Sequence, residues 1–158
     1  MPKRIAHKSR PHQCRKRPPF FRPVALRARA DGWSEARQCG FLVQLFLTGS
    51  VTAAARGVGM TRASAYRLRE RSGAASFAQA WDQVLTPPGS GRMAAPREDF
   101  RKVTLQELDR RLETGFVQPV IYQGRMCAMR RKPDNSALFR LLRRGGGCDD
   151  PYWSGSTE

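Results

Sequence analysis

Apolar residues recur three and four positions apart along residues 31–85, which is the spacing of helices that bury one face. Ser34 is a good N-cap for a helix that starts at Glu35, and Gly49 ends that helix. A further helix is predicted over residues 75–85, with an aromatic stripe on one side. The core of this region is expected to contain Trp33, Phe41, Leu42, Leu45, Phe46, Phe77, Trp81 and Val84 or Leu85.

Residues 50–71, read SVTAAARGVGMTRASAYRLRER, have the spacing of a helix-turn-helix. A small residue, Ala55, lies where two helices must approach closely, and Gly59 follows where the turn needs a positive φ. Thr61 suits the N-cap of the second helix. Apolar contacts between the helices are expected from Val58, Met60, Ala65 and Leu68. A corner of this kind also occurs in helical domains that bind no nucleic acid.

The outer face of the second helix carries the candidate DNA-binding residues. Arginine can donate to guanine edges and to phosphates, and tyrosine can contact a phosphate or a thymine, so this face suits a major groove. Arg62 or Arg67 is expected to read guanine, while nearby arginines hold the DNA backbone. The full set is Thr61, Arg62, Ala63, Tyr66 and Arg67 in the groove, with Arg56, Arg69 and Arg71 on the backbone.

The chain changes character after residue 85. Residues 86–97 are rich in proline and glycine and are expected to form a linker. Residues 98–113 predict a helix, ended by Thr114 and Gly115.

A β-hairpin and a last helix are predicted next. Val120 to Tyr122 and Met126 to Arg130 form the hairpin arms, with Gln123-Gly124 as the turn. Asp134 or Asn135 is expected to cap a helix that carries Leu138, Phe139, Leu141 and Leu142. We expect residues 98–145 to form one helix–hairpin–helix unit for oligomerisation or docking, and residues 146–158 to be a flexible tail. The predicted fold is therefore mainly α, with a helix-turn-helix domain of about four short helices over residues 31–85.

Positive charge concentrates at the N-terminus. The chain has 29 Lys and Arg against 13 Asp and Glu, a formal net charge of +16, and a pI of about 11.2. Residues 1–30 hold ten of these basic residues, five prolines and no acid, which predicts a disordered arm. The arm is either a solubilising tail or a set of DNA backbone contacts. The candidates for such contacts are Arg15, Lys16, Arg17, Arg22, Arg27 and Arg29.

Other functional classes find little support in the sequence. The four cysteines are far apart and His7 and His12 both lie in the arm, so no metal ion or other cofactor is expected. The sequence contains no phosphate-binding loop, so we do not expect an enzyme. No run approaches the roughly 20 apolar residues of a membrane span. We expect a cytoplasmic, nucleoid-associated protein in which Cys39 is a small buried residue.

Two stretches resemble a known group of proteins. The run GWSEARQCGFLVQLFLTGSVTAAARGVGMTRASAYRLRERSGAASFAQAWD is similar to the helix-turn-helix of alphaproteobacterial proteins that resemble phage terminase small subunits. The run PVIYQGRMCAMRRKPDNSALFRLLR looks like a second block of the same group, a hairpin leading into a leucine-rich helix. Together the two runs cover about half of the chain.

Terminase small subunits bind a packaging site on viral DNA, assemble into rings, and pass the DNA to a large subunit with ATPase and nuclease activity. The resemblance implies that Arg62, Tyr66 and Arg67 read double-stranded DNA. It also implies that the chain forms a homo-oligomer and that a terminase large subunit is a partner.

Two other functions stay open from the sequence. The first is a transcription regulator, for which a dimer with half-sites one helical turn apart is typical. The second is a basic structural protein of RNA or of the nucleoid, which would bind nucleic acid without sequence preference.

Overall fold

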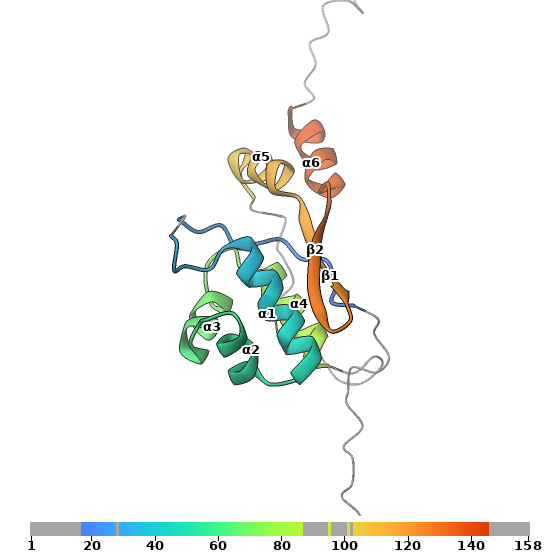
Figure 1. Ribbon diagram of the computed structural model, residues 1–158. Helices are drawn as coiled ribbons and strands as arrows, with labels where there is room; N and C mark the ends of the chain where they lie inside the picture. Colours follow the sequence, from blue (N-terminus) through green and yellow to red (C-terminus); the bar gives the residue numbers. More distant parts are fainter. Residues whose placement is uncertain (1–16, 28, 87–94, 96–100, 102, 146–158) are drawn as a thin grey trace, which may run out of the picture. The chain divides into compact units, whose positions relative to one another are not determined.

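The computed structural model describes residues 17–27, 29–86, 95, 101 and 103–145. These residues form six helices and one two-stranded antiparallel hairpin, which confirms the predicted mainly helical fold (Figure 1). Contacts between residues divide the chain into two units. The first unit contains Met1–Glu98 and Phe116–Lys132, and the second contains Asp99–Gly115 and Pro133–Glu158.

Four helices of the first unit lie where the apolar spacing predicts them. They are α1 (Glu35–Thr48), α2 (Val51–Gly57), α3 (Arg62–Arg69) and α4 (Ala75–Leu85). At the start of α1, the hydroxyl of Ser34 accepts a hydrogen bond from the backbone N–H of Arg37 at 3.3 Å. Gly49 follows α1 with a φ of 65°, a left-handed conformation that favours glycine. Local capping chemistry therefore sets both ends of α1.

The core of the first unit forms around an aromatic cluster on α1. The ring of Phe41 is fully buried, and its centroid lies 4.7 Å from the ring of Trp81. The rings of Trp33 and Phe77 lie 5.6 Å and 6.0 Å from Phe41. Pairs of this kind add to the stabilisation that burial alone provides. The other predicted core residues are buried as well, except that Leu85 is only partly buried beside the buried Val84.

The predicted hairpin is present, with longer arms than its sequence pattern indicates. Strand β1 (Phe116–Tyr122) pairs antiparallel with β2 (Arg125–Lys132). The turn residues Gln123 and Gly124 both have positive φ, at 48° and 73°. Two successive positive φ angles match the right-handed twist of the strands, which explains why a glycine-containing pair forms this turn.

The hairpin belongs to the first unit, whereas the sequence analysis grouped it with the helices on either side of it. Both strands contact α1, and Val117 on β1 is fully buried in the same core as Phe41 (Figure 1). Residues 98–145 therefore do not form the single unit that was predicted, because the hairpin groups with the first unit. Its hairpin packs on a helix from the first third of the chain, a pairing that no local pattern reveals.

The expected disordered arm over residues 1–30 does not hold for residues 17–27. Phe21 pairs with Val117 of β1 through two backbone hydrogen bonds, of 2.9 Å and 2.8 Å. Phe21 is fully buried, and Val24 is 5% exposed. The side-chain amide of Gln118 donates to the carbonyl of Pro18 at 2.7 Å. These apolar and backbone contacts offset the cost of ordering the segment. Residues 1–16 lie outside the part of the chain that the structure describes.

Two helices make up the described part of the second unit, α5 (Leu105–Thr114) and α6 (Asn135–Gly145). Of the helix predicted over residues 98–113, the described residues Arg101, Val103 and Thr104 lie outside α5, and residues 98–100 and 102 lie outside the part of the chain that the structure describes. The helix begins after Thr104, whose hydroxyl accepts from the backbone N–H of Glu107 at 3.2 Å. Asp134 caps α6 in the same way, accepting from the backbone N–H of Ala137 at 3.1 Å. The buried core of this unit is small and consists of Val103, Leu108 and Ala137, with Leu112 and Leu141 partly buried against it.

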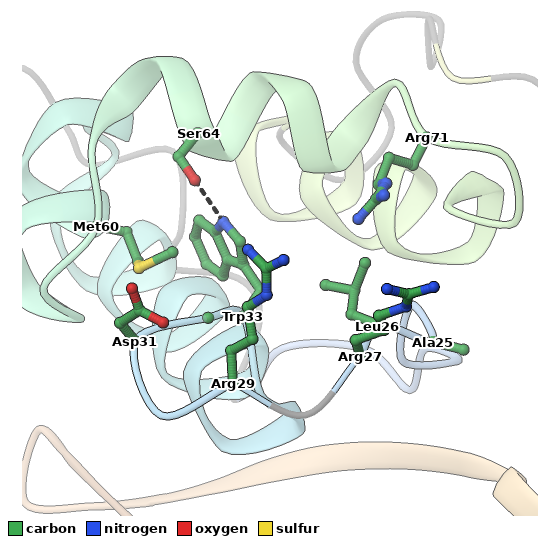
Figure 2. A pocket seen from close by; sticks show the side chains of 10 residues that line it. Ala25, Leu26, Arg27, Arg29, Asp31, Trp33, Met60, Ser64 and Arg71 are labelled. Atoms are coloured by element: carbon green, nitrogen blue, oxygen red, sulfur yellow. Dashed lines mark hydrogen bonds between the residues drawn. The ribbon is translucent and has the colours of Figure 1, made fainter.

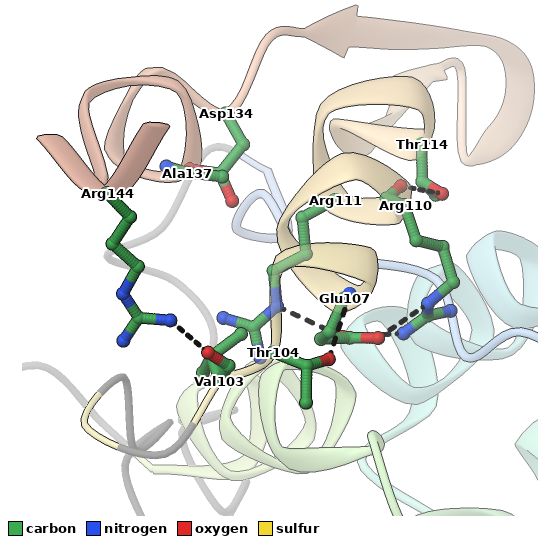
Figure 3. Close-up of polar contacts among 9 residues, drawn as sticks. All are labelled: Val103, Thr104, Glu107, Arg110, Arg111, Thr114, Asp134, Ala137 and Arg144. Atoms are coloured by element: carbon green, nitrogen blue, oxygen red, sulfur yellow. Dashed lines mark hydrogen bonds and ion pairs between the residues drawn. The ribbon is translucent and has the colours of Figure 1, made fainter. Parts of the chain in front are cut away.

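A charged cluster stabilises α5 (Figure 3). The carboxylate of Glu107 accepts two hydrogen bonds of 2.8 Å from the guanidinium of Arg110 and one of 3.0 Å from Arg111. Hydrogen bonding from Arg110, followed by that from Arg111, lowers the pKa of Glu107 to about 2. Arg144 of α6 donates to the carbonyl of Val103, which joins α6 to the residue that precedes the α5 cap.

The predicted linker over residues 86–97 lies mostly outside the described residues. Of its described members, Ala95 is buried, and its backbone N–H donates to the carboxylate of Asp82 at 2.7 Å. The predicted tail over residues 146–158 lies outside the described residues altogether. None of the described helices combines the length and the apolar character needed to cross a membrane.

Candidate nucleic-acid interface

Helices α2 and α3 form a helix-turn-helix whose geometry follows from two N-caps and a tight turn. Ser50 caps α2 by accepting from the backbone N–H of Ala53 at 3.4 Å, and Thr61 caps α3 by accepting from that of Ser64 at 3.1 Å. Gly59 has a φ of 72° in the turn between the helices. The backbone N–H of Met60 then donates to the carbonyl of Ala55 at 2.9 Å, which folds the turn back on α2.

The inner faces of these helices fix the orientation of α3. Ala54 and Ala55 on α2 are fully buried, as is Ala65 on α3, and Leu68 is 2% exposed. The small residues let the two helices approach closely, and Leu68 anchors α3 in the core. Burying this face leaves the opposite face of α3 toward solvent.

The outer face of α3 brings together the residues predicted to enter the groove. Thr61, Arg62, Ala63 and Arg67 are exposed, and Tyr66 is 37% exposed. The guanidinium of Arg62 lies 5.6 Å from the ring centroid of Tyr66. The ring of Tyr66 in turn lies 5.4 Å from the buried ring of Trp81 on α4. Tyr66 is therefore held against the core, while the arginines on either side of it are exposed.

The three arginines predicted to hold the DNA backbone divide into two kinds. Arg56 and Arg71 are exposed. The guanidinium of Arg69 lies 2.7 Å from the carboxylate of Asp82 and 5.2 Å from the ring centroid of Trp81, and its side chain is only 21% exposed. Arg69 therefore joins α3 to α4, and this role differs from the one predicted for it.

The residues predicted to contact the DNA backbone from the basic arm differ in their exposure. Arg17, Arg27 and Arg29 are exposed, whereas Arg15 and Lys16 lie outside the described residues. The prediction for Arg22 is wrong, because this residue is only 2% exposed. Its backbone N–H donates to the hydroxyl of Ser76 at 2.8 Å, and its guanidinium lies 4.8 Å from the ring centroid of Phe116. A side chain held in this way cannot reach a phosphate.

Sequence reasoning missed a contact that joins the segment before α1 to α3. The indole N–H of Trp33 donates to the hydroxyl of Ser64 at 2.7 Å (Figure 2). As a result Arg27 and Arg29 lie with Arg71, from the end of α3, around one pocket (Figure 2). The sequence carries no direct signal for this contact, because Trp33 and Ser64 are 31 positions apart.

The part of the chain that the structure describes contains no group of three or more His, Cys, Asp or Glu side chains that could hold a metal ion. Cys39 is buried, as predicted, and burial, together with the nearby charge of Glu35, raises the pKa of its thiol to about 12. Cys127 is exposed, and its thiol donates to the carbonyl of Val120 at 3.5 Å. Cys39 therefore lacks the low thiol pKa typical of a reactive cysteine.

Comparisons of the chain with protein-family models, with curated proteins and with solved structures gave no match.

The different surroundings of Arg69 and Arg67 predict different effects on stability. Arg69→Ala should lower the free energy of unfolding by about 1–3 kcal/mol, because the buried carboxylate of Asp82 loses its charged partner. Arg67→Ala, on the exposed face of the same helix, should change it by less than about 0.5 kcal/mol. Urea unfolding followed by tryptophan fluorescence measures both values. Equal losses in the two variants would show that the Arg69–Asp82 pair adds nothing.

Proposed function

We propose that this chain binds double-stranded DNA, with α3 in the major groove. The observation that supports this best is the outer face of α3, where Arg62, Tyr66 and Arg67 are exposed on a helix whose inner face is buried. α3 has eight residues and is therefore about 12 Å long at 1.5 Å per residue. An α-helix with its side chains is about 10–12 Å across, and a major groove about 12 Å wide admits it.

In this proposal the residues of α3 have distinct tasks. Arg62 or Arg67 donates two hydrogen bonds to a guanine edge, and Tyr66 contacts a phosphate or a thymine methyl group. Thr61 and Ala63 lie at the start of α3, the end at which recognition helices contact base edges. Arg56 on α2 is exposed and holds a phosphate.

The charge of the chain supports the same proposal. A net charge of +16 over 158 residues attracts a polyanion, and it raises the rate at which DNA is encountered. Of the arm, exposed Arg17, Arg27 and Arg29 remain candidates for backbone contacts, together with the basic residues before residue 17. Binding to DNA in the cell implies a cytoplasmic, nucleoid-associated protein.

The resemblance to terminase small subunit-like proteins suggests one role for such binding, which is recognition of a packaging site for a terminase large subunit. Regulation of transcription is the alternative in the same class. A nucleoid or RNA structural protein would use the same positive charge without the base contacts of α3. A preference for one DNA sequence over another is expected of the packaging and regulatory roles but not of the structural role.

If Arg67 reads a base, its removal should weaken the preference of the chain for its DNA site. Arg67→Ala should reduce the preference for a selected site over a scrambled duplex by about 1–3 kcal/mol, which is the contribution of one bidentate contact. Site selection on the wild-type chain, followed by fluorescence anisotropy with both duplexes, measures it. Arg125→Ala, an exposed arginine at the tip of the hairpin, is the matched control. A preference that is unchanged in both Arg67→Ala and Arg62→Ala would contradict groove reading by α3.

A truncation tests the charge that precedes the folded unit. Deletion of residues 1–16 removes six basic residues and leaves the Phe21–Val117 pairing in place. If about half of these six each neutralise a phosphate, the slope of log K against log salt should become less steep by about 2 to 3, with site preference retained. Binding titrations at several salt concentrations measure the slope. An unchanged slope would show that this charge does not contact DNA.

Self-association is a further part of the proposal: an exposed apolar face on α6 packs against a second copy of this chain. Helix α6 buries Ala137, but Leu138, Phe139 and Leu142 are 38%, 66% and 58% exposed on another side of it. Leu138 and Leu142 are four positions apart and therefore neighbours on the helix surface. Helix-turn-helix proteins that read two-fold symmetric sites need two copies, which a shared apolar face on each copy supplies.

The mass of the chain in solution tests this part. Light scattering should give a dimer or a larger assembly, and the double variant Leu138→Ser/Leu142→Ser should reduce it to the monomer because the shared apolar surface is lost. Tyr122→Ser is the control, since Tyr122 is a large hydrophobic residue on the hairpin that is 67% exposed. A ring-sized assembly favours the packaging role and a dimer favours the regulator. A monomer at every concentration would contradict self-association.

A further inference from the structure

A pocket of about 530 Å³ lies beside α3, between that helix and the segment that leads into α1 (Figure 2). Arg27 and Arg29 line it from the segment, and Arg71 lines it from the residues that follow α3. Figure 2 shows the side chain of Arg71 directed toward the segment and that of Arg29 directed toward α3. The pocket lies within the first unit, and Trp33 and Ser64, which are hydrogen-bonded to one another, both line it.

The charge around this pocket is unbalanced. Three arginines and one carboxylate, that of Asp31, line it, which gives a net charge of +2. Within the described residues, no ion pair engages Arg27, Arg29 or Arg71. By contrast, Arg69, Arg110, Arg111 and Arg131 each have a carboxylate within 3.0 Å. Converging guanidinium groups without carboxylate partners are typical of phosphate recognition, because each presents a planar fork of N–H donors.

The volume of the pocket and the apolar residues of its lining indicate the kind of ligand that it can hold. A volume of about 530 Å³ lies in the range of about 300–1,000 Å³ that is usual for small-molecule sites. Leu26, Trp33 and Met60 supply an apolar surface next to the arginines. Asp31 lies on the Met60 side, away from Arg71 (Figure 2). A carboxylate there disfavours a second negative group and can accept a hydrogen bond from a sugar hydroxyl or a base amino group.

We propose that this pocket binds a nucleotide phosphate, with Arg29 and Arg71 on the phosphate and the apolar surface against the rest of the nucleotide. Two sources offer this group: a free mononucleotide, and the backbone of bound DNA. The proposal does not depend on base reading by α3, because the pocket lining excludes Arg62, Tyr66 and Arg67. It does have a consequence for α3. Ser64 of α3 lines the pocket and is hydrogen-bonded to Trp33, so a bound nucleotide touches the helix proposed to read DNA.

Isothermal titration calorimetry on the full chain tests the free source, with AMP, adenosine and inorganic phosphate as probes. AMP should bind, and it should bind more tightly than adenosine or inorganic phosphate, because the pocket holds the phosphate of AMP at one end and its adenosine part at the other. Arg29→Gln and Arg71→Gln should each weaken AMP binding at least tenfold. Arg125→Gln removes the same charge at the hairpin tip, outside the pocket, and should leave AMP binding unchanged. Thermal unfolding of each variant checks that the fold is retained.

Duplex titrations with the same variants test the DNA source. If AMP does not bind, but Arg29→Gln and Arg71→Gln each reduce the salt slope of DNA binding by about 1 while Arg125→Gln does not, the pocket holds a backbone phosphate. Equal effects of all three variants on both ligands would overturn the proposal, and so would the absence of any effect. AMP binding that depends on the pocket, in a chain that binds no duplex, would support the pocket and overturn the proposed DNA-binding function.

Discussion

The burial of α1 constrains the elements that pack against it in the first unit, which are α2, α4 and both strands of the hairpin. Its buried residues run from Gln38 to Phe46 and cover about 200° of the helix circumference at 100° per residue. A helix buried over so wide an arc needs partners on several sides. Helices α2 and α4 and both strands of the hairpin contact it. Helix α2 is therefore placed by its packing on α1, and α3 by its contacts with α2 and α4, which leave the outer face of α3 uncovered.

One polar residue on α1 explains why the chain before it is ordered. Gln38 is fully buried, so its amide must find partners inside the protein. Its Oε1 accepts from the backbone N–H of Val24 at 2.8 Å, and its Nε2 donates to the carbonyls of Val24 and Trp33 at 3.0 Å and 3.2 Å. The amide thereby replaces the backbone partners that an extended segment would otherwise find in a sheet. The same clamp holds both ends of the segment that carries Arg27 and Arg29.

The sequence predicts the local part of this structure well. The N-caps Ser34 and Thr61, the glycine at 59 and the Gln123-Gly124 turn act through atoms a few residues away, so their patterns can be read directly. The exposed face of α3 can also be predicted, because burial of Ala65 and Leu68 follows from helical periodicity.

The errors concern contacts between distant residues. Phe21 pairs with Val117, the hairpin packs on α1, and Arg69 meets Asp82, and in each case the partner lies on another element. A basic, proline-rich composition indicated an arm, but it could not show that the apolar residues within it complete the core. The early start predicted for α5 has a different cause, since the apolar Val103 fits the helical stripe yet is buried just before the Thr104 cap.

Trp81 shows how the core determines the surface that we propose for DNA binding. Its ring is 1% exposed and lies against Phe41 and Phe77 on the inner side, at 4.7 Å and 6.1 Å between centroids. The ring of Tyr66 and the guanidinium of Arg69, both on α3, pack on the ring of Trp81. The core therefore holds both side chains of α3 in place. Immobilising a side chain on binding costs about 0.5–1.5 kcal/mol, so the packing of Tyr66 on Trp81 lowers the cost of the association with DNA that we propose. Because Trp81 lies on α4, the contacts of α4 with α1 help to position the surface that we propose for DNA binding, even though no residue of α4 is proposed to touch DNA.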